Sequence, residues 1–179
     1  MSTETLKIGS QAPAFVLSAT NDKTYSLESF AQIKALVVIF SCNHCPYVQA
    51  YEDRIMKIQN DYAKDLQIVA ISSNEDENYP EDSFEKMKER ASMKGFNFPY
   101  LHDATQSVAK NYGATHTPEI FLFDKERKLV FHGKIDDNWQ EPNNVKSNYL
   151  RNAIDELLAR KQISVPETFT IGCTIKWKK

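Results

Sequence analysis

The sequence contains little of several residue types, and each shortage excludes a class of protein. Its three cysteines are too few, and odd in number, for a scaffold held together by disulfides. No apolar run reaches the roughly 18 residues that a membrane-spanning helix needs. The five glycines form no Gly-x-Gly-x-x-Gly motif. Neither a flavin nor a nicotinamide site is therefore indicated.

The sequence also has no large excess of positive or negative charge. Lys and Arg number 22 against 24 for Asp and Glu, so the net charge of -2 gives no reason to expect nucleic acid or an anionic membrane as the main partner. The segment Met1–Ser10 is polar and lacks the apolar core of a signal peptide. We therefore expect a cytoplasmic protein, in a compartment where cysteines are more often catalytic, metal-binding or part of the core than cross-linked.

What is present fits one α/β domain. The segments 15–17 and 24–27 flank the polar turn Asn21-Asp22-Lys23, and this pattern predicts a short hairpin. The apolar run Ala35–Phe40 is too short for a helix and predicts a fully buried strand. After it, apolar residues recur at spacings of three and four, which places them on one helical face: Val48, Tyr51, Ile55, Ile58 and Tyr62.

The remaining pattern completes the fold class. Gln67–Ile71 predicts a second strand, so that strand, helix and strand form a right-handed parallel βαβ unit. The further elements expected are a helix from Pro80 to Gly95, a strand over Phe98–Leu101, a short helix over Val108–Tyr112, a hairpin of Glu119–Phe123 with Leu129–His132, and a last helix over Val145–Arg160. Together they predict a mixed sheet with a parallel centre and an antiparallel edge, flanked by helices on both faces.

The most informative segment lies between the buried strand and the first helix. It reads Ser41-Cys42-Asn43-His44-Cys45-Pro46 and contains a Cys-x-x-Cys pair. Unpaired N–H groups at a helix N-terminus stabilise a thiolate and lower the pKa of a thiol. We therefore expect Cys42 to be the attacking thiolate, and Cys45, more deeply buried, to release the product by attacking Cys42.

The neighbours of the two cysteines are expected to support them. Pro46 fixes the start of the helix, and a protonated His44 would stabilise the thiolate further. The alternative for His44 is a simple exposed loop residue. Asn43, between the cysteines, is counted among the supporting residues.

This strand, motif and helix resemble the active site of the thioredoxin superfamily. The segment Gly9-x-x-Ala12-Pro13-x-Phe15 is similar to the start of peroxiredoxin and AhpC/TSA-type redoxin domains. The resemblance is strongest to a peroxiredoxin-like group that carries Cys-Asn-His-Cys-Pro-Tyr-Val and, near the C-terminus, Gly-Cys-x-Ile-Lys-Trp, here Gly172–Trp177. It implies a thioredoxin-like fold over residues 5–160 with an N-terminal hairpin extension, and a C-terminal tail over residues 161–179.

The resemblance also gives roles to residues far from the motif. Thr117-Pro118 precedes the predicted strand Glu119–Phe123, as in thioredoxin-like proteins. Pro118 should therefore be cis and shield the cysteine pair, and the Thr117 backbone should pair with an extended substrate segment. Because only about 5–6% of X-Pro bonds are cis, this is a sharp prediction.

Two features depart from the family pattern. The peroxiredoxin motif Pro-x-x-x-Thr/Ser-x-x-Cys fits neither cysteine, since its first two positions hold Val38 and Cys42, or Ala35 and Ile39. Thioredoxins bury an Asp before the first cysteine, and the strand Ala35–Phe40 has no acid. Glu119 is the hypothetical substitute as proton acceptor for Cys45, and its alternative is a solvent-exposed carboxylate on an edge strand.

Other candidate residues have two interpretations each. Cys173 is either a third redox thiol that resolves Cys42 or links two subunits, or a small apolar residue that anchors the tail. Trp139 either lines a substrate surface or packs, and Glu75–Glu77 are expected to form a solvated loop. No metal site is expected, because the histidines outside the motif are scattered over the chain: His102, His116 and His132.

The expected function is thiol–disulfide exchange through Cys42 and Cys45. The partners would be a protein or small disulfide and a separate reductase system, with no cofactor. One alternative is a thiol peroxidase, in which peroxide oxidises Cys42 to a sulfenic acid that Cys45 resolves. The other is a non-catalytic thioredoxin-fold module that binds a partner or Cu(I), for which thiolates are suitable ligands.

Overall fold

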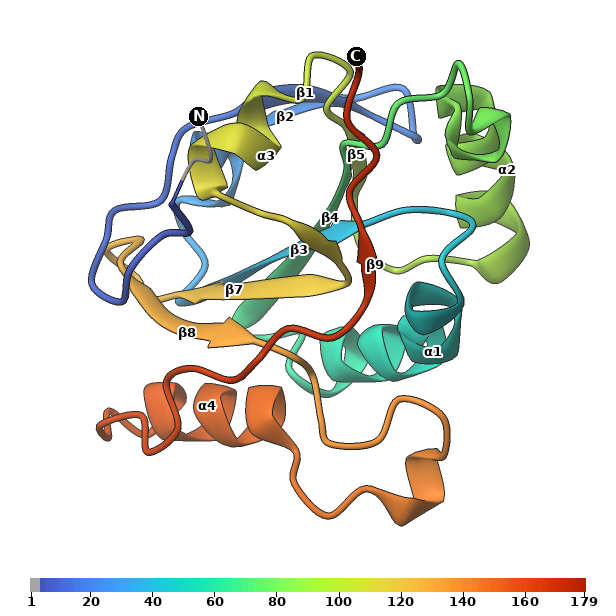
Figure 1. Ribbon diagram of the computed structural model, residues 1–179. Coiled ribbons are helices and arrows are strands. Elements are labelled where there is room, and N and C mark those ends of the chain that lie inside the picture. Colours follow the sequence, from blue (N-terminus) through green and yellow to red (C-terminus); the bar gives the residue numbers. More distant parts are fainter. Residues whose placement is uncertain (1–3) are drawn as a thin grey trace.

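A seven-stranded mixed sheet organises the fold, in the strand order β2-β1-β5-β4-β3-β7-β8 (Figure 1). The computed structural model describes residues 4–179, so residues 1–3 of the polar segment Met1–Ser10 lie outside the described residues. The strands of this sheet are β1 (Val16–Ala19), β2 (Thr24–Ser26), β3 (Ala35–Ser41), β4 (Leu66–Ser72), β5 (Tyr100–His102), β7 (Glu119–Phe123) and β8 (Leu129–Gly133). A separate two-stranded sheet pairs β6 (His116–Thr117) with β9 (Cys173–Thr174).

The centre of the sheet is parallel and both of its sides are antiparallel. β3 runs parallel to β4, and β4 runs parallel to β5. On one side the β7–β8 hairpin continues the sheet, as predicted, and on the other side the N-terminal β1–β2 hairpin adds to β5. The predicted parallel centre and antiparallel edge are confirmed, and the hairpin extension forms a second antiparallel edge.

β3 is buried along its whole length, because both faces of the sheet are covered. Its side chains alternate between two cores: Val37 and Ile39 belong to one, and Leu36 and Val38 to the other. Helices α1 (Pro46–Asp61), α2 (Phe84–Lys94) and α4 (Tyr149–Leu158) contribute to the first core, and α3 (Ser107–Tyr112) to the second. Figure 1 shows α1 and α4 on the face opposite α3.

Two predicted helices begin later than the sequence pattern indicates. The last helix starts at Tyr149 instead of Val145, because the backbone before it pairs with a loop. The N–H of Lys146 donates to the Asp137 carboxylate at 2.9 Å, and the Asp137 N–H donates to the carbonyl of Ser147 at 3.2 Å. Pro80 starts only a short 3-10 turn, Pro80–Asp82. α2 follows it, with the Ser83 hydroxyl accepting the N–H of Lys86 at 3.3 Å as an N-terminal cap.

The C-terminal tail crosses the molecule and is held by backbone hydrogen bonds. In Figure 1 it leaves α4, passes β8 and reaches β9 (red). The N–H of His132 donates to the carbonyl of Pro166 at 2.9 Å, and the N–H of Thr168 donates to the carbonyl of His132 at 3.0 Å. Further on, the buried Ile175 donates its N–H to the carbonyl of Thr115 at 2.9 Å.

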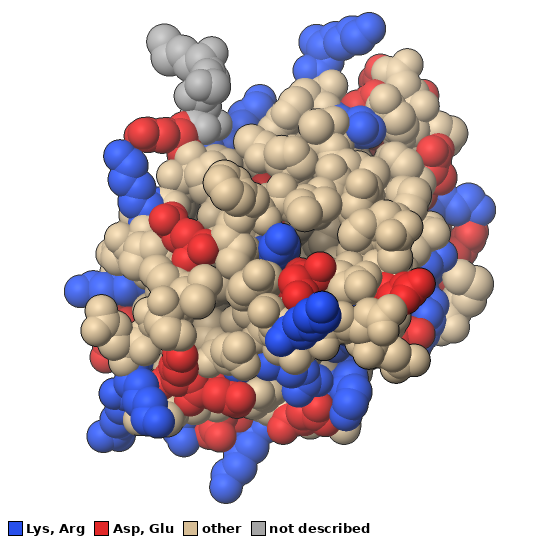
Figure 2. All heavy atoms as spheres, turned by 60° about the horizontal axis from the view of Figure 1, so that its bottom comes forward, with Lys and Arg blue, Asp and Glu red and all other residues tan. Residues whose placement is uncertain are grey.

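Two surface properties of the described residues bear on possible partners. No helix within residues 4–179 is both long and apolar enough to cross a bilayer. On the face that Figure 2 shows, Lys and Arg side chains lie among Asp and Glu side chains, in agreement with a net charge of -2.

Substitution of Phe121 tests the packing of the core around β7. Its ring is buried on β7 and meets the rings of Phe40 and Tyr112 edge-on, with centroids 5.8 and 5.5 Å away. Phe121→Ala should therefore lower the free energy of unfolding by about 3–5 kcal/mol in urea titrations under reducing conditions. Val16→Ala, at a position 71% exposed on β1, is the control and should change it by less than about 0.5 kcal/mol. Equal losses in both variants would contradict this description of the core.

Candidate active site

The Cys-x-x-Cys pair lies where β3 ends and α1 begins. β3 ends at Ser41, Cys45 is the N-cap residue of α1, and Pro46 occupies the first helical turn as predicted. The sequence-based expectation of a more exposed first cysteine is met only slightly, since Cys42 is 2% exposed and Cys45 is fully buried.

Thr117, which precedes Pro118, lies against the two sulfurs. The Thr117–Pro118 bond is cis, which confirms the prediction from the sequence. The hydroxyl oxygen of Thr117 lies 3.4 Å from Cys42 Sγ, and its carbonyl oxygen lies 3.3 Å from Cys45 Sγ. One residue therefore contacts both sulfurs.

The backbone edge of Thr117 is already paired with the chain's own tail. In the β6–β9 sheet, Thr117 stands opposite Cys173. The expected pairing of Thr117 with a substrate segment is thus replaced in this structure by an internal strand. Gly172 lets the tail come this close, because a Cβ atom there would lie 2.1 Å from the carbonyl oxygen of Thr117.

This pairing brings the third cysteine to the other two. Cys173 Sγ lies 2.7 Å from Cys45 Sγ, and Cys173 remains partly exposed. The sequence reasoning had Cys173 act on Cys42 or on a second subunit, whereas here its sulfur contacts Cys45 of the same chain. Since Cys45 also hydrogen-bonds to Cys42, it lies between the two other sulfurs.

Hydrogen bonds place the negative charge of the reduced site on Cys45. When ionised, its sulfur accepts hydrogen bonds from the thiols of Cys42 and Cys173 and from the backbone N–H groups of Val48 and Cys173. The Cys42 bond contributes most, and against the cost of burial these donors lower the pKa of Cys45 to about 4.

Cys42 has the opposite tendency. Its hydrogen bond to Cys45, its burial and the nearby charge of Asp82 raise the pKa of Cys42 far above that of a free thiol. In the reduced pair these effects favour the negative charge on Cys45 over Cys42.

Asp82 is the residue that sequence reasoning missed. It is fully buried beneath the motif and accepts the backbone N–H of Asn43 at 2.7 Å and that of His44 at 3.3 Å. Its other oxygen binds the Asn74 amide at 2.8 Å and the Nδ1 of His44. Asp82 thus fixes the loop between the cysteines. Because it lies far from them in the sequence, no local pattern indicates this role.

One acidic residue of the preceding loop is more buried than expected. Glu75 is 5% exposed, whereas Asp76 is half-buried and Glu77 exposed, so the prediction of a solvated loop over Glu75–Glu77 is wrong for Glu75 only. Its carboxylate accepts the N–H groups of Glu77 and Asn78 at 2.9 and 3.1 Å, so it closes the turn on itself.

The two residues between the cysteines anchor the loop. The Asn43 amide donates to the carbonyl of Glu81 at 2.8 Å, and its oxygen accepts the Tyr100 hydroxyl at 2.8 Å. The His44 ring stacks on Tyr79 with centroids 5.4 Å apart. His44 is therefore neither a free loop residue nor hydrogen-bonded to a sulfur, since its Nδ1 binds Asp82.

Within the described residues the Glu119 carboxylate makes no hydrogen bond to Cys45, the thiol for which it is the hypothesised proton acceptor. It is 1% exposed on β7, an interior strand, so it is not an exposed edge carboxylate either. One of its oxygens accepts the N–H groups of Thr115 and His116 at 2.7 and 2.9 Å, and the other lies 2.7 Å from His132 Nε2. Glu119 holds the turn that leads into Thr117.

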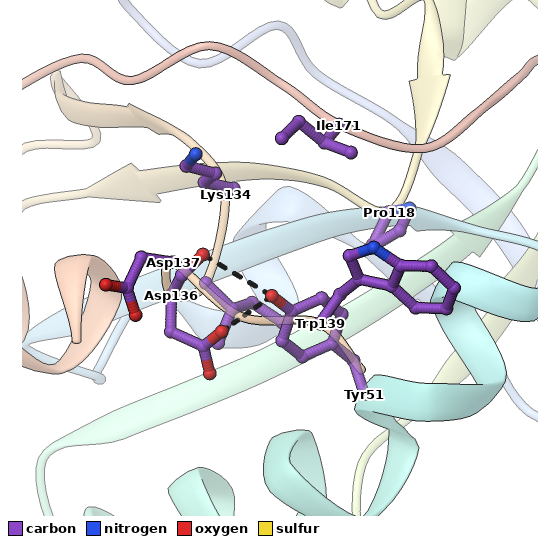
Figure 3. A pocket seen from close by; sticks show the side chains of 8 residues that line it. Tyr51, Pro118, Lys134, Asp136, Asp137, Trp139 and Ile171 are labelled. Carbon is purple, nitrogen blue, oxygen red and sulfur yellow. Dashed lines mark hydrogen bonds between the residues drawn. The ribbon is translucent and has the colours of Figure 1, made fainter. Parts of the chain in front are cut away.

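A hollow opens beside Pro118, the residue after Thr117. Figure 3 shows the Trp139 indole close to Pro118, with Ile171 of the tail above them. Below, the Tyr51 hydroxyl donates to the Asp136 carboxylate at 2.7 Å. Trp139 packs against the core and also borders this hollow, which supports the packing interpretation from the sequence.

Two groups of side chains could serve a metal ion. The three sulfurs form a soft donor set of the kind that suits Cu(I). Cys42, His44 and Asp82 also bring ligand-type atoms within 4.8 Å of one another. In that second group the Asp82 carboxylate is fully engaged by the N–H donors of the loop, so hydrogen bonding accounts for the cluster.

Comparison with known proteins identifies the family and the fold. The profile of the Redoxin family matches residues 7–149. A hypothetical protein from Sinorhizobium meliloti 1021 is 40% identical, with a TM-score of 0.90 over 98% of this chain and 97% of that chain. A conserved protein from Geobacillus kaustophilus is 42% identical, with a TM-score of 0.90 over 96% and 93% of the two chains. Among curated proteins, none matches the sequence.

More distant structures show the fold alone. The thioredoxin domain of a thiol-disulfide oxidoreductase from Bacteroides vulgatus is 23% identical, with a TM-score of 0.61 over 72% of this chain and 89% of that chain. The likeness confirms the predicted thioredoxin-like fold. Since the family profile spans most of the sequence, the chain belongs to the Redoxin family.

Proposed function

We propose that the protein is a thiol–disulfide oxidoreductase whose Cys42–Cys45 pair exchanges with external disulfides. The observation that carries this proposal is the hydrogen-bonded pair of sulfurs at the N-terminus of α1, where Cys45 is ionised and both sulfurs rest against Thr117. A helix N-terminus and a hydrogen-bonded neighbouring thiol are the means by which proteins keep a thiolate at neutral pH.

The reaction follows from the positions of the protons. Cys42 attacks one sulfur of the substrate disulfide, and its proton moves along the hydrogen bond to Cys45. A mixed disulfide forms and the first thiolate leaves, taking that proton. Cys45, again ionised, attacks Cys42 and releases the second thiolate. The substrate gains two electrons, and the protein holds a Cys42–Cys45 disulfide.

A separate electron donor must then reduce that disulfide. We propose a reductase system as the donor and a small or protein disulfide as the substrate. The hollow lined by Pro118 and Trp139 would hold the part of the substrate that does not react.

Serine variants and a redox titration test the proposed function. Cys42→Ser and Cys45→Ser should each abolish dithiol–disulfide exchange, because one sulfur alone cannot close the ring. Cys45→Ser should also accumulate a mixed disulfide with glutathione at Cys42, seen by mass spectrometry. Val16→Ala serves as the surface control. If the reduced protein never equilibrates with oxidised glutathione, yet consumes peroxide stoichiometrically, the peroxidase alternative replaces this proposal.

Asp82→Asn tests the electrostatics of the pair. Asp82 places a negative charge near Cys42 and thereby raises the pKa of that thiol. Removing the charge makes deprotonation easier, so the pH dependence of Cys42 alkylation by iodoacetamide should shift to lower pH. Glu81→Gln is the matched control, because the Glu81 side chain is exposed. An unchanged pH profile in a folded Asp82→Asn variant would refute this coupling.

A further inference from the structure

The C-terminal tail delivers a third sulfur to the pair. Cys173 lies on β9, directly opposite Thr117 of β6, and Thr117 is the residue that contacts both Cys42 and Cys45. The sulfurs of Cys45 and Cys173 are 2.7 Å apart. This is a cluster of three thiols, and the exchange reaction described above uses only two of them.

The tail holds Cys173 in place from both sides. Before it, Gly172 packs on the Thr117 carbonyl so closely that no side chain fits between them. After it, Lys176 donates its N–H to the Asn74 side chain at 2.9 Å, and its carbonyl accepts the N–H of Glu75 at 2.9 Å and the amide of Gln106 at 2.8 Å. The position of Cys173 is therefore built into the fold.

Exposure differs among the three sulfurs. Cys42 and Cys45 are buried, whereas Cys173 is partly exposed. With the tail in place, Cys173 is the thiol between the buried pair and the solvent.

We propose that Cys173 is a third redox thiol that exchanges with the Cys42–Cys45 disulfide inside one chain. The inference rests on the proposed function, which supplies that disulfide. The Cys173 thiolate attacks Cys45, the bond between Cys42 and Cys45 breaks, and a Cys45–Cys173 disulfide forms. Cys42 leaves as a thiolate and takes up the proton that Cys173 lost. No electron enters or leaves, so the step is an isomerisation that frees Cys42.

Oxidation of the pair itself would prepare Cys173 to react. In the reduced protein, burial, the hydrogen bond to Cys45 and the charge on Cys45 raise the pKa of Cys173 to about 12, while Lys176 opposes them. Once Cys45 is bonded to Cys42, it carries no charge. Of the four causes that raise the pKa of Cys173, the two that come from Cys45 then disappear, while burial and the charge of Asp82 still raise it and Lys176 still lowers it.

Disulfide mapping tests this step. The reduced full-length protein is oxidised with a limiting amount of diamide, its free thiols are blocked with N-ethylmaleimide in acid, and it is digested with trypsin. Cys42 and Cys45 lie in one peptide, residues 35–54, and Cys173 lies in another, residues 162–176. A disulfide should join the two peptides in the wild-type protein. The linked fraction should be larger in Cys42→Ser and absent in Cys45→Ser.

A change in the tail gives an independent measurement. Gly172→Ala should drive β9 away from Thr117 and lose most of the linked peptide, while the Cys42–Cys45 disulfide still forms. Thr174→Ala, which changes an exposed side chain on the same strand, should keep the link.

Each result has a defined meaning. If the Cys42–Cys45 disulfide forms but the peptides are linked in neither the wild type nor Cys42→Ser, this inference fails and the proposed function stands. If neither disulfide forms, both fail. If the link joins two chains, seen as a dimer on a non-reducing gel, or if Gly172→Ala keeps it at the wild-type level, the intramolecular step is overturned.

Discussion

The site depends on one buried negative charge, the thiolate of Cys45, and on the donors that surround it. An ionised group without partners is costly to bury, so such a group persists only where hydrogen bonds replace water. Those donors come from the start of α1, from Cys42 and from the tail. Residues after β3, in α1 and in the tail therefore all donate hydrogen bonds to the Cys45 thiolate.

The other contacts serve to keep that arrangement in place. Asp82 binds the backbone of the loop between the cysteines, and Glu119 binds the backbone of the turn before Thr117. Both carboxylates are buried and fully hydrogen-bonded, which is the condition under which buried acids are tolerated. They act on the sulfurs through the backbone segments that they hold, and Asp82 also acts through its charge.

What the sequence predicted correctly was local in the chain. β3, the motif and α1 are adjacent, so hydrophobic spacing and a helix N-terminus sufficed to find them, and Pro118 carried its own family signal. The roles of Asp82, Glu119 and Cys173 depend on which distant segments the fold brings together, and neither composition nor spacing encodes that. The late start of α4 has the same cause, because Asp137 binds backbone groups that a local pattern assigns to a helix. The donors that the tail adds around Cys45 are likewise not encoded in any local pattern.

The pairing of β6 with β9 has a consequence for how the molecule meets other chains. A strand whose backbone groups are unpaired is a template for any extended segment that approaches it. In this protein the last residues of the chain occupy that template at Thr117, and Gly172 allows them to do so without a gap. An extended segment of another chain could therefore pair with this edge of Thr117 only after displacing the tail.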